Sequence, residues 1–172
     1  MTRITIIQGE YRVERSPEVV ITTLLGSCIA VCLHDCVAKV GGMNHFLLGM
    51  PSGDAILSSA DRQRYGIHAM ELLINEMMRH GAARSRLRAH LYGGATITAG
   101  LGAIGMNNVK FARDFMVTER ISVAHWDLGG ERGRRVEFRP YDGKARSSFV
   151  AAIVPTVKPP VRDTHGGDVE LF

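Results

Sequence analysis

The segment VVITTLLGSCIAVCL, residues 19–33, contains two predicted strands separated by a short break. Residues 19–25 are rich in β-branched side chains, which are typical of strands. Gly26-Ser27 interrupts this run, and an alternating pattern of larger and smaller side chains resumes from Ile29 to Leu33. The segment therefore predicts two strands, with Cys28 at the break between them.

Residues 40–48 predict a further strand, which would form a hairpin-like pair with residues 29–33. A helix is expected over residues 67–79, where apolar side chains follow helical spacing, and Gly81 is expected to end it. Asn107 or Asn108 is expected to cap a second helix that runs to about Arg120. Loops are expected over residues 51–64 and 95–106, and further strands over residues 87–92, 121–126, 136–141 and 147–154.

The order of these elements favours an α+β fold. Strands and helices are mixed without strict βαβ alternation, so a doubly wound sheet is not expected. The chain has 172 residues, of which 45% are hydrophobic, and this is enough for one core. We expect one layered domain with a mixed sheet over residues 1–156. The remaining residues, 157–172, contain Pro159-Pro160 and Gly166-Gly167 and are expected to be an extended or mobile tail.

The charge balance gives little sign of a nucleic-acid partner. Lys and Arg number 21 against 17 Asp and Glu, a net charge of +4, and the basic residues are scattered. Their one cluster, Arg132, Arg134 and Arg135, is interpreted as a solvated turn. No segment resembles a signal peptide or a membrane span, so no membrane insertion is expected and the cytoplasm is the expected location.

The three cysteines, Cys28, Cys32 and Cys36, form an odd-numbered group within one short segment. A disulfide framework usually has an even count that is spread along the chain, so free thiols in a reducing compartment are expected. A metal site formed by this group with a nearby histidine is an alternative, but a strand here and the lack of a CxxC knuckle argue against it. Cys32 and Cys36 are expected to be packing residues, and Cys28 the most reactive thiol.

Cys28 and His45 are the minimum pair for thiol catalysis if their strands lie side by side. The histidine would take the thiol proton, and the thiolate would be the nucleophile. A third group must orient the imidazole, and Thr22 or a backbone carbonyl could do this. On local pattern alone, a buried structural cysteine and a satisfied core histidine are the alternatives. The glycine-rich stretch from Gly93 to Gly105 lacks the spacing of a phosphate-binding loop and is interpreted as loops near a substrate cleft.

The sequence resembles the chemoreceptor glutamine deamidase family, CheD, over roughly residues 8–150. The resemblance is carried first by residues 22–35 (TTLLGSCIAVCLHD) and residues 41–48 (GGMNHFLL). The chain differs from the family at Asn107, where a basic residue is common. Further matches are Tyr92-Gly93-Gly94-Ala95, Ile104-Gly105 with Asn108, and Asp127 with Gly129-Gly130 and Arg134.

This resemblance implies a layered αβ fold similar to the catalytic domain of the cytotoxic necrotizing factor toxins. It implies Cys28 as nucleophile, His45 as base and Thr22 as the third member, with no metal or cofactor. Gly26, Ser27, Gly93 and Gly94 are expected to line the cleft or an oxyanion site. The implied reaction converts glutamines of methyl-accepting chemoreceptors to glutamate. A second implied role is that of a regulatory binding partner for a CheC-type phosphatase.

Overall fold

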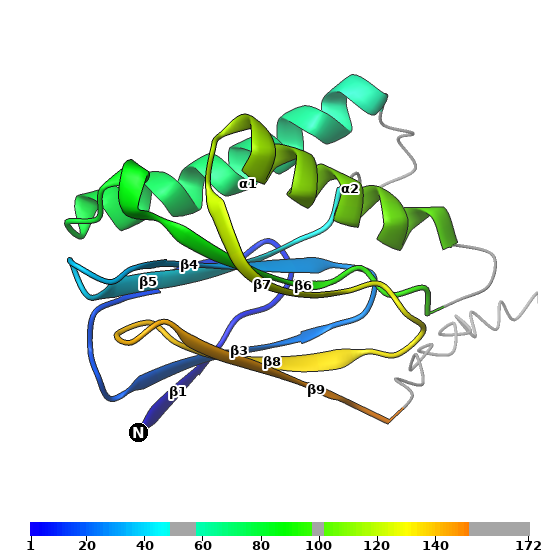
Figure 1. Cartoon of the computed structure of the whole chain (residues 1–172). Coiled ribbons are helices and arrows are strands. Elements are labelled where there is room, and N and C mark those ends of the chain that lie inside the picture. The colour runs from blue at the N-terminus through cyan, green and yellow to red at the C-terminus, as the bar shows by residue number, and fades with distance from the viewer. Residues whose placement is uncertain (49–57, 98–101, 152–172) are drawn as a thin grey trace, which may run out of the picture.

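Two mixed β-sheets stack face to face, and two helices cover the outer face of one of them (Figure 1). The computed structural model describes residues 1–48, 58–97 and 102–151. The four-stranded sheet has the order β1-β3-β8-β9, and the five-stranded sheet has the order β2-β5-β4-β6-β7. The first sheet consists of β1 (Thr2–Thr5), β3 (Val19–Leu25), β8 (Arg134–Arg139) and β9 (Lys144–Phe149). The second consists of β2 (Tyr11–Glu14), β4 (Ile29–Asp35), β5 (Val40–Phe46), β6 (Arg88–Gly93) and β7 (Ser122–Leu128).

The expected α+β architecture is confirmed, but it contains two mixed sheets where one mixed sheet was expected. In the four-stranded sheet β1 and β3 are parallel, and in the five-stranded sheet β6 and β7 are parallel. All other neighbouring strands are antiparallel. The predicted hairpin-like pair is also confirmed, because β4 and β5 are antiparallel neighbours. Strand β3, however, belongs to the other sheet, so the break at residues 26–28 is a crossover from one sheet to the other.

The core consists of two apolar clusters, one between the two sheets and one between the five-stranded sheet and the helices. Between the two sheets lie Ile21, Leu25, Met43, Tyr92 and Phe138, all at most 1% exposed. Fully burying one such large side chain stabilises a fold by about 1.5–3 kcal/mol relative to leaving it in water. A second cluster lies between the five-stranded sheet and the helices, and it includes Leu33, Phe46, Leu73, Ile74, Met77 and Phe111.

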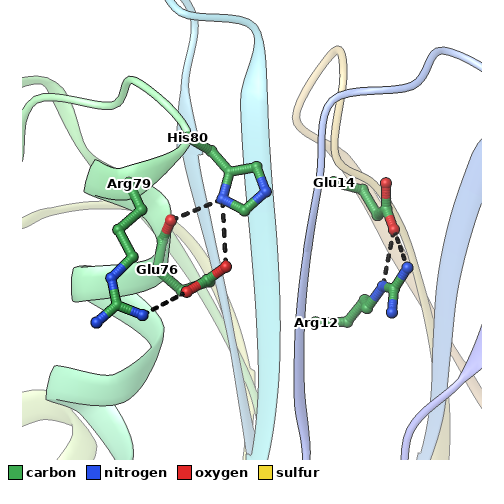
Figure 2. A network of polar contacts seen from close by, with 5 residues as sticks. All are labelled: Arg12, Glu14, Glu76, Arg79 and His80. Carbon is green, nitrogen blue, oxygen red and sulfur yellow. Dashed lines mark hydrogen bonds and ion pairs between the residues drawn. The ribbon is translucent and has the colours of Figure 1, made fainter.

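Helix α1 (Ser59–Arg79) begins earlier than the apolar spacing indicates. Its first two turns are mostly exposed, so the helical period is invisible there, but the side chain of Ser58 caps the helix by accepting from the N–H of Asp61. At the other end Gly81 has φ +97°, which ends the helix as predicted. Figure 2 shows that Glu76 pairs there with Arg79 and His80, while Arg12 and Glu14 pair separately on β2.

Helix α2 (Gly102–Thr118) corrects the expected loop at residues 95–106 and the expected caps at Asn107 and Asn108. The helix starts before both asparagines. Glycine disfavours helices, and this is why the sequence indicated a loop. Gly105 is needed for packing, because a Cβ there would lie 2.6 Å from the carbonyl oxygens of both Gly94 and Ala95. Tertiary packing thus overrides the local preference.

Strands β1 and β2 were not predicted from the sequence. Both are short strands at one edge of their sheets, and most of their residues are exposed, so they lack a clear apolar alternation. The expected tail at residues 157–172 lies outside the described residues. Neither α1 nor α2, the α-helices of the part of the chain that the structure describes, is long and apolar enough to cross a membrane.

Candidate active site

Cys28 lies at the crossover between the two sheets, where its side chain is half-buried. Every carbonyl of this short segment is bonded to a neighbouring element. The N–H of Ala95 donates to the carbonyl of Gly26 (3.0 Å), and the N–H of Gly94 donates to that of Cys28 (2.9 Å). The side-chain amide of Asn108 donates to the carbonyl of Ser27 (2.7 Å). The backbone that carries the thiol is therefore fixed from the side of β6 and α2.

Gly93 and Gly94 allow this close approach. Their φ angles are +109° and +70°, and a Cβ on Gly93 would lie 2.1 Å from the carbonyl oxygen of Cys28. Only glycine fits such a position. Because the N–H of Gly94 is bonded to the carbonyl of Cys28, it supports the segment and is not free to face an oxyanion in this arrangement.

Asn108 is a site residue whose role the local sequence did not reveal. It is fully buried on α2, and its Oδ1 accepts from the N–H of Leu48 (3.0 Å) while its Nδ2 reaches Ser27. One side chain thus joins the segment before Cys28 to the residues after β5. The only signal in the sequence was that Asn108 belongs to a stretch that resembles the family.

Arg134 corrects the interpretation of the arginine cluster as a solvated turn. Its side chain is 2% exposed, while Arg132 and Arg135 are exposed. The guanidinium donates to the carbonyls of Gly93 (2.8 Å), Asp127 (3.0 Å) and Gly129 (2.7 Å). A buried cation needs such partners, and here they connect β6, β7 and the following turn behind the Cys28 segment.

His45 lies on β5 and points into the space between the sheets. It pairs with Ala30 on β4, and Cys28 stands two residues before Ala30, at the crossover that precedes β4. Cys28 also packs against the apolar cluster between the sheets. The structure therefore brings the sequence-predicted cysteine and histidine to one face.

The residue that contacts the imidazole is Thr23, not Thr22. The hydroxyl of Thr23 lies 2.8 Å from His45 Nδ1, while that of Thr22 lies 3.2 Å from the hydroxyl of Thr5. Successive residues of a strand point to opposite faces, so only one of the two threonines can face His45. Thr23 shares the inner face with Ile21 and Leu25, and this alternation was the signal in the sequence that separates it from Thr22.

The hydrogen bonds of Thr23 define the proton positions on the imidazole. Its hydroxyl donates its single proton to the carbonyl of Ile6 (2.7 Å), so toward His45 the oxygen is an acceptor. Nδ1 therefore carries the proton of the neutral ring, and Nε2 is the basic nitrogen. Burial lowers the pKa of His45 to about 4, against an opposing effect of the Glu10 carboxylate, so the ring is neutral near pH 7.

The thiol of Cys28 is also neutral at rest. Burial raises its pKa to about 11, and Sγ donates to Oε1 of Gln8 at 3.7 Å. A thiol and an imidazole that are both neutral can exchange a proton only as the nucleophile attacks. This arrangement suits general-base catalysis better than a permanently formed thiolate.

The other two cysteines differ from each other. Cys32 is buried between the sheets, as expected of a packing residue, and burial holds its pKa well above the ordinary range. Cys36 is exposed, so its expected role in packing is wrong: it follows the end of β4, where the chain turns at the surface. Within residues 1–48, 58–97 and 102–151 there is no cluster of three or more His, Cys, Asp or Glu side chains that could hold a metal ion.

The α+β fold and the Thr23, His45 and Cys28 group together contain the parts that cysteine-dependent hydrolases use. The chain belongs to the CheD family: a family model described as CheD chemotactic sensory transduction matches residues 47–148. A protein of Acidiphilium cryptum named probable chemoreceptor glutamine deamidase CheD is 49% identical over 99% of this chain and 93% of its own. Proteins of the same name from Zymomonas mobilis (49% identical, 99% and 92% covered) and Rhizobium rhizogenes (52%, 84% and 78%) are also similar.

Two solved structures are distant neighbours. A Neisseria meningitidis protein of the DUF152 family has a TM-score of 0.42 at 12% identity, covering 70% of this chain and 53% of that one. The Bacillus licheniformis hypothetical protein YfiH has a TM-score of 0.43 at 13% identity, covering 68% and 49%.

Proposed function

We propose that this protein is a chemoreceptor glutamine deamidase in which Cys28 is the nucleophile and His45 the base. The observation that carries the proposal is the neutral imidazole of His45, held by Thr23 with Nε2 unprotonated, on the face that it shares with Cys28. The name shared by relatives that are 49% identical over nearly the whole chain supplies the substrate class.

The proposed reaction is acyl transfer in two steps. As the thiol of Cys28 attacks the glutamine carboxamide carbon, its proton passes to Nε2 of His45 and then to the leaving nitrogen, which departs as ammonia. A thioester remains. Water then attacks the thioester, His45 takes its proton, and glutamate and the free thiol are released. None of these steps requires a metal or a cofactor.

Thr23 takes the orienting role in this proposal, in place of Thr22. Its hydroxyl stabilises the imidazolium that forms when Nε2 accepts the proton, because Nδ1–H already points at an oxygen. Gly26 and Ser27 remain proposed cleft-lining residues, whereas Gly93 and Gly94 support the Cys28 segment from behind. The likeness to the catalytic domain of cytotoxic necrotizing factor toxins and a cytoplasmic location belong to the same proposal.

Binding to a CheC-type phosphatase is a second proposed role, and it is compatible with catalysis. A pure adaptor would have no need for a histidine whose proton positions are defined. Ammonia release separates the two roles: an enzyme releases it from a receptor fragment, and an adaptor does not.

The direct test is mass spectrometry of a chemoreceptor co-expressed with this protein. Each deamidated glutamine gains about one dalton, as hydrolysis of an amide to an acid requires. The wild-type protein should produce the shift, and a folded Cys28→Ala variant should not. A receptor that is equally modified by both proteins would disprove the assignment of Cys28.

A further inference from the structure

Gln8 is itself a glutamine side chain placed at the proposed nucleophile. Its carboxamide oxygen Oε1 accepts from Sγ of Cys28 at 3.7 Å. Gln8 is exposed in the turn between β1 and β2, and thus comes from a segment distant in sequence from Cys28. A glutamine carboxamide against this thiol is the functional group that the proposed reaction consumes.

The turn that carries Gln8 is fixed to the site on both sides. Before it, the N–H of Ile6 donates to the carbonyl of Thr22 (3.0 Å), and the carbonyl of Ile6 accepts from Thr23. After it, the N–H of Gly9 donates to the carbonyl of His45 (2.8 Å), and the N–H of His45 donates to the carbonyl of Glu10 (3.0 Å). The strands that carry Thr23 and His45 therefore hold Gln8 over Cys28.

We propose that Gln8 is an intramolecular substrate, which Cys28 converts to glutamate; this inference rests on the proposed deamidase function. Holding two reacting groups together raises their effective concentration by orders of magnitude over a free peptide. Oε1 now faces the thiol, so attack requires rotation of the terminal amide. That torsion of glutamine is broad, and the rotation turns a face of the carbonyl group toward Sγ while the carbon itself stays in place.

The step balances without any added reactant except water. A C–S bond forms at the Gln8 carbonyl carbon and the C–N bond breaks, while the thiol proton leaves with nitrogen as ammonia by way of His45. Water then supplies the oxygen that replaces sulfur, and the thiol is regenerated. The net change is carboxamide plus water to carboxylate plus ammonia, with no oxidation or reduction.

The chain contains its own control. It has two glutamines, Gln8 and Gln63, and Gln63 lies exposed on α1, which covers the outer face of the five-stranded sheet, whereas Cys28 lies at the crossover between the two sheets (Figure 1). Spontaneous hydrolysis depends on the local peptide and not on Cys28. Only enzymatic conversion can therefore be selective for Gln8 and dependent on Cys28 at the same time.

The experiment is peptide mass spectrometry of the purified protein over a time course, with wild type, Cys28→Ala and His45→Gln variants that thermal melts show to be folded. A receptor fragment is assayed in the same tubes. Position 8 should gain about one dalton in wild type, at least about 100-fold faster than in either variant, because nucleophile and base each contribute such factors. Gln63 should stay unchanged throughout. Isotopically labelled Cys28→Ala protein mixed with wild type should retain its Gln8, because the reaction is within one molecule.

Three outcomes would overturn the inference. Wild type could keep Gln8 while it deamidates the receptor fragment, which leaves the proposed function standing. Position 8 could convert equally in Cys28→Ala protein, or in labelled protein in trans, which makes the change spontaneous or intermolecular. Failure of wild type to convert either Gln8 or the receptor fragment would contradict the proposed function and the inference with it.

Discussion

The hydroxyl of Thr23 lies 2.8 Å from Nδ1 of His45 and donates its own proton to the carbonyl of Ile6, 2.7 Å away. The imidazole therefore presents Nε2 as an unprotonated base. This relationship depends on which face of β3 each threonine occupies, and the variants below test it.

Replacing Thr23 should reduce deamidation more than replacing Thr22. Thr23→Val keeps the shape but removes the acceptor for Nδ1–H, so we expect turnover to fall about tenfold or more, yet less than the roughly 10²–10⁴-fold loss expected for His45→Ala. Thr23→Ser should retain most of the wild-type activity, because serine keeps the hydroxyl. The measurement is the deamidation rate on one receptor fragment after melts have shown folding.

Thr22→Val is the matched control, because the Thr22 hydroxyl lies 3.2 Å from the hydroxyl of Thr5, whereas it is Thr23 that contacts His45. It should turn over at nearly the wild-type rate. If Thr22→Val were the more damaging change, the third member of the group would be Thr22, as the family resemblance implies, and the orienting role of Thr23 would be wrong.

Brief iodoacetamide labelling at about pH 7 should modify Cys36 before Cys28. This reverses the expectation from the sequence: Cys36 is exposed, whereas Cys28 is half-buried and burial raises its pKa to about 11, so little thiolate exists at neutral pH. The labelling rate of Cys28 should keep rising as pH increases toward 11. Peptide mapping would measure the labelling rates of Cys28 and Cys36 at each pH. A rate for Cys28 that levels off below about pH 8 would show a permanently activated thiolate and contradict the prediction.

Asn108→Asp should impair turnover through the Cys28 segment. Aspartate keeps an acceptor for the N–H of Leu48, but it loses the donor to the carbonyl of Ser27 and places a carboxylate against that oxygen. An unsatisfied buried group costs about 1–3 kcal/mol, so some loss of stability is also expected. Asn107→Asp, at the exposed neighbouring position, is the control and should change neither quantity appreciably. Equal effects at the two positions would contradict the role given to Asn108.

Arg134→Met should destabilise the fold by about 2–4 kcal/mol, because it removes the side-chain donor to the carbonyls of Asp127 and Gly129 and one of two donors to the carbonyl of Gly93. Arg135→Met removes the same charge at an exposed position and should cost less than about 0.5 kcal/mol. Urea unfolding measures the change in the free energy of unfolding for each variant. A near-neutral Arg134→Met protein would show that water replaces the guanidinium at these carbonyls.

Stability should fall as pH decreases from about 6.5 to about 4. The pKa of His45 is lowered to about 4 in the fold, so in this window the unfolded chain binds the proton that the folded chain does not. The loss from this residue is on the order of 3 kcal/mol at most. Burial also lowers the pKa of His90, which adds to the effect in the same direction. Urea midpoints at about pH 7 and about pH 4.5 should differ less in His45→Gln than in wild type. An undiminished difference would assign the effect to other groups.

Local patterns in the sequence were sufficient for much of the fold. The bounds of β3 were predicted to the residue, and the spacing located the buried side chains Met70, Leu73, Ile74 and Met77 of α1. Ile67 and Met78 follow the same spacing but are exposed. Cys28 was correctly placed at a break between strands. These features depend on neighbours in the chain, namely β-branched runs, helical spacing and a glycine interruption, so the chain by itself encodes them.

The remaining features depend on contacts between distant segments. That the break at Cys28 crosses from one sheet to the other follows from the pairing of β3 with β8 and of β4 with β5. The same pairing turns Thr23 toward His45, and packing of α2 against Gly94 sets a helix where glycines indicated a loop. Arg134 is buried for the same kind of reason, since its three carbonyl partners come together only in the folded chain. The sequence alone determined which residue types stand beside the break, whereas the stacking of the two sheets decided which of them meet, because a side chain's face and partners are properties of strand pairing and not of the strand itself.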